Sequence, residues 1–431
     1  MHRALFSSLR QGTQSPYDEL RPPFLIDYDR LIFSNPFRRL SKKTQVHPLA
    51  KNDHVHNRLT HSLEVASVGR TLGLGVGHHI LRIDPKCPHS PYDVAAIIQS
   101  ACLAHDIGNP PFGHAGEEII KEWFTHHASP YMDELSMEEK ADFLAFDGNA
   151  QSFRIITQLE NHPKEGGMRL THSTQASMIK YPWEAIDPRS GGKKFSFFQS
   201  EKKIARELLE GFGLKEAAEL LRHPFSYLME AADDICYALL DIKDAVELGM
   251  LKANQMEEIF LPLCGEKEYQ KSLSSQGNSD YEKVSRLCAI AIGRLTQQAL
   301  ESFIAHELLT PKKGVKDLVS LFIDKSLREG LEKAKALGHE KIFNEPRKIE
   351  LELGAYRTIG ILLENLIHAA YSLHRGEESF KTKHALMLIG HHAPRREQSL
   401  YEKYRAVLDF ITGMTDNYAT HLAGQLGGMG R

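Results

Sequence analysis

The chain has 431 residues, of which 42% are hydrophobic and 25% are charged, a balance typical of a globular protein with a large buried core. A formal net charge of −3 gives no electrostatic argument for nucleic acid or a membrane as the principal partner. The five cysteines form no Cys-x-x-Cys pair, and no apolar run approaches the ~20 residues of a membrane span. We therefore expect a cytoplasmic protein with reduced thiols and no membrane contact.

Apolar residues recur at helical spacing along most of the chain. In the first part the pattern predicts helices over 37–46, 57–70, 92–105, 114–127, 149–161, 171–180 and 225–248, the first of them short, basic and leading into a turn or brief strand. Later in the chain it predicts helices over 281–308, 314–337, 348–374, 378–391 and 400–423. Strand signals are few. The expected fold class is therefore mainly α, with at most short β ribbons.

A polar segment rich in serine and glycine separates these two groups of helices. We interpret residues 266–280 as a flexible linker or loop. This interpretation divides the chain into a core with an N-terminal extension, residues 1–265, and a C-terminal helical region, residues 281–431, that packs on the core.

Four reactive side chains flank one helix break in the stretch 103–117, LAHDIGNPPFGHAGE. His105 and Asp106 come at the end of one predicted helix, and His114 and Glu117 come at the start of the next. The Gly-Asn-Pro-Pro sequence between them stops the first helix and turns the chain. The break indicates a site at which two helices meet.

Two other predicted helices carry polar residues in apolar surroundings and could complete a metal site. These residues are His61 and one of the paired carboxylates Asp233 and Asp234. With His105 and Asp106 they form a mixed nitrogen and oxygen set that suits a divalent transition metal or Mg²⁺. Taken singly, a helical histidine is usually a hydrogen-bonded structural residue, and the paired aspartates could be a solvated helix face.

Several motifs resemble those of the deoxyguanosine triphosphate triphosphohydrolase (dGTPase) family. This family belongs to the HD-domain superfamily of metal-dependent phosphohydrolases, which also includes the vertebrate SAM-and-HD-domain dNTPase. The similar segments are His56–Ser62 (HNRLTHS), 104–117 (AHDIGNPPFGHAGE), 180–183 (KYPW) and 230–237 (EAADDICY), with a weaker similarity at 352–356. The resemblance covers about residues 27–370 and implies an HD-type helical core with additional C-terminal helices.

The resemblance implies that the metal is held by His61, His105, Asp106 and Asp233. Asp233 is preferred to Asp234 because the family pattern places a tyrosine four residues and an aspartate eight residues after the ligand, as Tyr237 and Asp241 are here. Positions at this spacing share one face of a helix. The metal itself stays open between Mg²⁺, Mn²⁺ and other transition metals such as Fe, Co or Ni.

The implied reaction is attack of water on the α-phosphorus of a deoxynucleoside triphosphate (dNTP), with release of deoxynucleoside and inorganic triphosphate. His114 and Glu117 resemble the family's catalytic histidine and its orienting acid. His114 would either protonate the departing 5′-oxygen or position the nucleophile. The residues that resemble substrate contacts are Gln45, Val46, Arg58, Asn149, Lys180, Tyr237 and Asp241.

The family also implies a homo-oligomer, a hexamer or tetramer, and a dNTP or single-stranded DNA as effector. No motif fixes the base preference. Two alternatives stay open: another HD-type phosphohydrolase, such as a nucleotidase or phosphodiesterase, and a regulatory nucleic-acid-binding HD protein. The basic runs at 38–43 and 395–396 motivate the second alternative, whereas the complete ligand set favours the enzyme.

Overall fold

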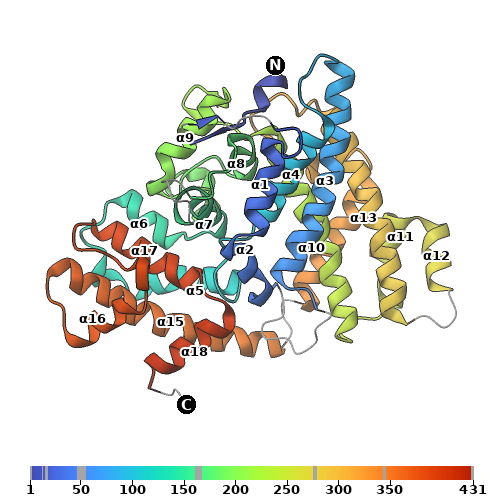
Figure 1. Ribbon diagram of the computed structural model, residues 1–431. Coiled ribbons are helices and arrows are strands. Elements are labelled where there is room, and N and C mark those ends of the chain that lie inside the picture. Colours follow the sequence, from blue (N-terminus) through green and yellow to red (C-terminus); the bar gives the residue numbers. More distant parts are fainter. Residues whose placement is uncertain are drawn as a thin grey trace.

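The computed structural model describes residues 2–11, 13–14, 18–45, 55–160, 167–274, 279–342 and 346–428. Helices make up most of this part of the chain, which confirms the mainly α fold class (Figure 1). Two antiparallel ribbons join β1 (Leu9–Arg10) to β2 (Thr13–Gln14) and β3 (Lys215–Glu216) to β4 (Glu219–Leu220). No helix in the described ranges has the length and apolar character needed to cross a membrane.

The helices of the first half carry all four predicted metal ligands or lead directly into them. They are α1 (Pro23–Ile32), α2 (Asn35–Arg39), α3 (Arg58–Ile83), α4 (Pro91–Ala104), α5 (His114–His126), α6 (Met137–Leu144), α7 (Gly148–Arg154), α8 (His172–Met178), α9 (Lys202–Gly211) and α10 (Pro224–Glu247). The second half contains α11 (Glu257–Cys264), α12 (Glu266–Leu273), α13 (Asp280–Ala305), α14 (Lys325–Leu337), α15 (Pro346–Arg375), α16 (Phe380–Met387), α17 (Leu400–Thr412) and α18 (Asp416–Leu426).

The helix predicted over 400–423 is broken into α17 and α18. Gly413 ends α17, and the Thr415 hydroxyl accepts a hydrogen bond from the amide of Tyr418 to cap α18. The predicted linker 266–280 carries α12, and its residues 275–278 lie outside the described ranges. The break between α17 and α18 changes the direction of the chain beside the candidate site.

Two hydrophobic clusters divide the molecule. The first is built from α1–α4 and α8–α14, and the second joins α5 and α6 to α15–α18. In Figure 1 the orange and red C-terminal helices accordingly lie beside α5 and α6, and α11–α13 lie on the opposite side of the molecule. Helices α13 and α14 follow the segment 266–280 but belong to the same hydrophobic cluster as the helices before it. The division of the chain into two regions at 266–280 therefore stays a prediction.

A stripe of glycines on α3 allows close contact with α4. A Cβ atom at Gly73 would lie 2.6 Å from the Cα atom of Ala95, and Gly69 and Gly77, one turn away on either side, meet α4 as closely. Close packing fixes the positions of both helix ends nearest the site, where α3 begins at Arg58 and α4 ends before His105. The two predicted histidine ligands are thereby brought together.

Candidate metal centre and substrate cavity

The start of α3 is fixed by a capping box that places His61 in the first turns. The Asn57 side chain accepts hydrogen bonds from the amides of Leu59 and Thr60, and the Thr60 hydroxyl accepts one from the amide of Asn57. Arg58 and His61 are both almost fully buried. Their orientation is therefore set by local backbone chemistry as well as by packing.

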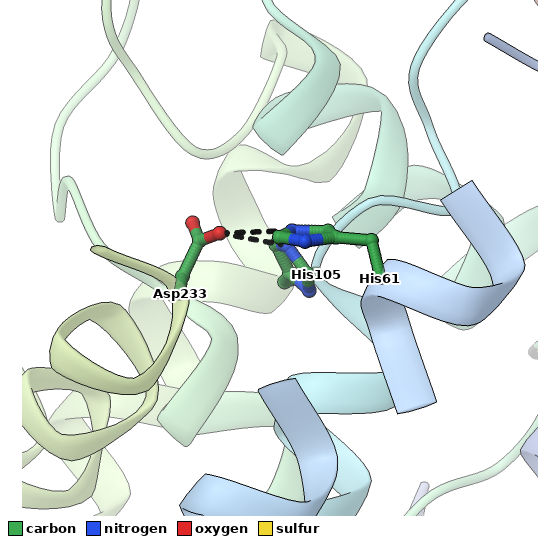
Figure 2. Close-up of side chains that lie close together, drawn as sticks. All are labelled: His61, His105 and Asp233. Atoms are coloured by element: carbon green, nitrogen blue, oxygen red, sulfur yellow. Dashed lines mark hydrogen bonds and ion pairs between the residues drawn. The ribbon is translucent and has the colours of Figure 1, made fainter. Parts of the chain in front are cut away.

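His61, His105 and Asp233 meet from three different helical regions (Figure 2). The Nε2 atoms of His61 and His105 lie 3.2 Å and 3.4 Å from Oδ1 of Asp233. One ligand atom of each residue lies within 4.8 Å of the others, so a single cation can contact all three. Two imidazoles and a carboxylate form a donor set suited to a divalent transition metal.

The hydrogen bonding of His105 supports a cation at this point. Its Nδ1 donates to the carbonyl oxygen of Cys102 at 2.6 Å, which leaves Nε2 facing the carboxylates of Asp233 and Asp106. This buried Nε2 has no hydrogen-bond partner. Burial lowers the pKa of His105, but the two carboxylates outweigh it and raise the pKa. The same negative charge that attracts a proton here would attract a metal ion.

Asp106 lies beside this group and is held by two donors. Its Oδ2 accepts from Nη1 of Arg58 at 2.6 Å, and its Oδ1 accepts from Nδ2 of Asn109 at 2.7 Å. The same Oδ1 lies 3.5 Å from Nε2 of His105. That Asp106 is a fourth metal ligand stays a prediction.

The two neighbouring aspartates of α10 point to different partners. Asp233 faces the histidines and accepts from Nζ of Lys180 at 2.8 Å, whereas Asp234 forms an ion pair with Nζ of Lys335 at 2.8 Å. Burial opposes the charge on Asp233, but Lys180 and His105 outweigh it and hold its pKa well below the usual range. Asp233 is therefore ionised and available to a cation.

A cavity of about 440 Å³ is lined by the three candidate ligands His61, His105 and Asp233. It gathers nearly all of the residues that the sequence predicted for the site. Those that line it are Gln45, Arg58, His61, His105, Asp106, His114, Glu117, Asn149, Lys180, Asp233 and Tyr237. Asp241 is buried one helical turn after Tyr237, and among the described residues it does not line the cavity. Val46 lies outside the described residues.

Several buried polar atoms in the cavity wall have no hydrogen-bond partner among the described residues. They are Nε and Nη2 of Arg58, Oε1 of Gln45 and Nε2 of His105. Buried polar atoms are normally hydrogen-bonded, so four unsatisfied atoms around one cavity indicate a ligand that satisfies them. The two arginine donors suit an anion, and the glutamine oxygen suits a hydroxyl group.

The comparisons with known proteins agree with this geometry. A model of the HD domain matches residues 58–247, the segment that supplies the three helical regions of the site. A Pseudomonas aeruginosa protein named deoxyguanosinetriphosphate triphosphohydrolase-like is 44% identical over 95% of both chains. The chain belongs to this deoxyguanosinetriphosphate triphosphohydrolase-like family. A Synechocystis member is 36% identical over 99% of this chain and 98% of its own, and a Yersinia enterocolitica deoxyguanosinetriphosphate triphosphohydrolase is 28% identical over 93% of each.

HD domains are metal-dependent hydrolases, and His61, His105 and Asp233 are the candidate metal site of this family member. His114 is the first residue of α5, and its side chain lines the same cavity. Although the His114 side chain is exposed to the cavity, desolvation by the surrounding protein and the charges of Arg58 and Lys194 lower its pKa to about 4. In the free protein this imidazole is therefore neutral at neutral pH.

Glu117 is buried and is held by groups other than His114. Its Oε1 accepts from the amide of Gly148 at 3.1 Å, and its Oε2 lies 3.8 Å from Nζ of Lys194. Within the described residues no hydrogen bond joins Glu117 to His114, so their pairing in this family member stays a prediction. Catalytic hydrogen bonds are often long before substrate binds, and the two side chains share one helix face.

Sequence reasoning missed several lining residues, of which Lys194 and Lys348 add positive charge. Lys194 belongs to the loop between α8 and α9, and its signal was the Gly-Gly-Lys-Lys sequence at 191–194. Lys348, at the start of α15, lies 2.5 Å from Oε1 of Glu352. Neither lysine belongs to the family-like motifs, although Lys194 follows the motif at 180–183 and Lys348 precedes the weaker similarity at 352–356.

Proposed function

We propose that this chain is a metal-dependent hydrolase that converts dNTPs, with dGTP the first to test, into deoxynucleoside and inorganic triphosphate. Membership of the deoxyguanosinetriphosphate triphosphohydrolase-like family supports the reaction type and substrate class. The observation that carries the proposal is the set of unsatisfied buried atoms around one cavity. These atoms are complementary to a cation, an anion and a hydroxyl group, and a metal–dNTP complex would supply all three.

His61, His105, Asp106 and Asp233 would hold the metal. When bound, a divalent cation supplies Lewis acidity, since it neutralises phosphate charge and lowers the pKa of water. Two imidazole nitrogens favour Mn²⁺ or another transition metal such as Fe, Co or Ni over Mg²⁺, which prefers oxygen ligands. Lys180 and Arg58 each bind one of the carboxylates and keep those carboxylates oriented toward the cation.

The triphosphate would lie among the cations of the cavity. Arg58 offers its two unsatisfied donors, and Lys180 and Lys194 add ammonium groups. An arginine fork binds phosphate oxygens through paired hydrogen bonds, and each lysine acts as a point charge. A substrate with three phosphates thus finds positive charge on more than one side.

The sugar would lie toward Gln45 and Tyr237, with Val46, Asn149 and Asp241 as further predicted contacts. The free Oε1 of Gln45 would accept a hydrogen bond from the 3′-hydroxyl group. Burial, with Asp241 adding to it, raises the pKa of Tyr237, so its phenol stays protonated. A site without a partner for a 2′-hydroxyl group would reject ribonucleotides because that group would be buried unsatisfied.

His114 would handle the proton at the reacting phosphate, either at the departing 5′-oxygen or at the attacking water, with Glu117 as its orienting acid. Its pKa of about 4 in the free protein supports a neutral imidazole before substrate arrives. The negative charge of a bound triphosphate raises the pKa of a neighbouring imidazole and brings it toward the range useful for proton transfer.

We extend the proposal to the assembly and setting of the protein. It would act in the cytoplasm as a homo-oligomer, a hexamer or tetramer, with a dNTP or single-stranded DNA as effector. The five free cysteines fit a reducing compartment. A nucleotidase or phosphodiesterase of the HD type would instead release phosphate or a nucleoside monophosphate, so the products decide between these activities.

The test is to incubate the purified protein with each of the four dNTPs in Mn²⁺ or Mg²⁺ and to separate the products chromatographically. The expected result is equimolar deoxynucleoside and inorganic triphosphate from at least one dNTP. Release of phosphate or of a monophosphate would favour the other HD-type activities, and no product from any dNTP would overturn the proposal. The metal assignment is tested separately, by the metal content of the His105→Ala variant.

A further inference from the structure

The junction between α17 and α18 bonds to two segments of the cavity wall, at Phe112 and Thr44, that lie 304 and 372 residues before Asp416 in the sequence. Asp416, the first residue of α18, is buried. Its Oδ1 accepts a hydrogen bond from the amide of Phe112 at 2.9 Å. Its Oδ2 accepts from the amide of Thr44 at 2.9 Å and from the hydroxyl group of Thr44. One carboxylate therefore joins two separate walls of the cavity.

A buried lysine makes a second connection between the same parts. Nζ of Lys43 donates to the carbonyl oxygens of Asn109 and Thr412, both at 2.6 Å. Asn109 belongs to the turn between α4 and α5, and Thr412 is the last residue of α17. The α17–α18 junction is thus bonded both to the turn that leads into His114 and to the segment 43–45.

The turn between α4 and α5 needs such support because its backbone is strained. Phe112 has a φ of 63°, in the left-handed region that side chains other than glycine rarely adopt. Such a conformation persists only when neighbouring groups hold it. The amide that Asp416 binds belongs to this residue, and His114 follows two residues later. On the other side, Thr44 directly precedes Gln45.

We propose that Asp416 is a positioning residue for the reaction, because its carboxylate holds the turn carrying His114 and the segment carrying Gln45 in one arrangement around the substrate. This inference rests on the proposed function for its kinetic consequences. Asp416 touches neither the cavity nor a metal ligand in the described structure. It acts through the backbone of Phe112 and through Thr44, so its loss misplaces catalytic groups and leaves the metal centre in place.

The first test variant is Asp416→Asn, which keeps the shape of the side chain. An asparagine has one accepting oxygen and an NH₂ group that only donates, so either the Phe112 amide or the Thr44 amide would face another donor. We expect kcat to fall about tenfold to hundredfold, KM to rise, and bound metal to stay at the wild-type level. Thr44→Val removes only the hydroxyl bond and should raise KM about threefold to tenfold with kcat near wild type.

Thr415→Ala is the matched control, since Thr415 caps α18 but bonds to neither wall of the cavity. It should weaken α18 and leave kcat and KM unchanged. A merely structural role for Asp416 predicts instead that all three variants lose active protein in parallel, with kcat reduced and KM unchanged. That parallel loss would overturn the proposal, as would wild-type kinetics in Asp416→Asn.

Amide hydrogen exchange provides a readout that does not depend on activity. Peptides covering residues 107–118 should exchange faster in Asp416→Asn than in the wild type or in Thr415→Ala. Unchanged exchange at 107–118 would refute the positioning role even if the wild-type chain hydrolyses no dNTP. Failure of the wild type to hydrolyse any dNTP would refute the proposed function alone. If Asp416→Asn does not fold, Thr44→Val carries the kinetic test.

Discussion

Replacing Gly113 by alanine should reduce catalysis far more than it reduces stability. Gly113 has a φ of 61° and a ψ of −129°, a conformation that costs an L-residue about 1–3 kcal/mol. A Cβ atom there would lie 2.4 Å from Nη2 of Arg58, whereas ordinary contacts begin at 3.4 Å. The guanidinium would have to retreat by about 1 Å, and a misplacement of that size costs up to about 100-fold in rate.

The assay for this variant compares kcat/KM for dGTP with thermal unfolding. Gly213→Ala is the control, because Gly213 also has a positive φ, of 70°, but no atom lies within 4 Å of its would-be Cβ. Both variants should lower the thermal midpoint by a few degrees, and only Gly113→Ala should lose activity, by up to about 100-fold in kcat/KM. Equal kinetic effects in the two variants would refute the argument from the Arg58 contact.

Three further predictions concern the metal, the proton and acid stability. Asp233→Asn should lose bound metal and activity, whereas Asp234→Asn should keep both, as measured by metal analysis and turnover; equal metal loss in the two variants would contradict the assignment. His114→Ala should bind metal and dNTP but turn over at least ~100-fold more slowly, and metal loss would make His114 a ligand. Burial lowers the pKa of His223 from 6.5 to about 4, so the unfolded chain binds more protons between these values and stability falls as the pH drops through this window. Chemical denaturation should show the wild type losing about 2 kcal/mol more than His223→Gln between pH 7 and pH 5, and equal losses would contradict the assigned shift.

Much of the candidate site could be predicted from local sequence. The pair His105–Asp106 followed by a helix break, and the spacing of Asp233 and Tyr237 on one helix, mark residues whose chemistry is unusual for their apolar surroundings. The structure brings His61, His105 and Asp233 together. Helical periodicity likewise predicted most helices, because it reports which face of each helix is buried.

The exceptions arise where contacts between distant segments override local pattern. The break between α17 and α18 follows from Gly413 and the Thr415 cap, signals that the apolar periodicity of 400–423 concealed. Lys194 and Lys348 lie outside the family-like motifs, and the sequence around them does not show that their side chains line the cavity. Their contribution depends on the folding of the whole chain.

Local sequence is enough to predict the types of metal-binding side chain, the helical fold class and the glycine-, asparagine- and proline-containing turn between the metal ligands and His114, because each of these depends on residues within a few helical turns. The contact of Asp416 with Phe112 and Thr44, by contrast, depends on the folding of the whole chain. A buried carboxylate can hold two segments together only where packing places it against their backbone amides, and no local sequence pattern encodes that contact.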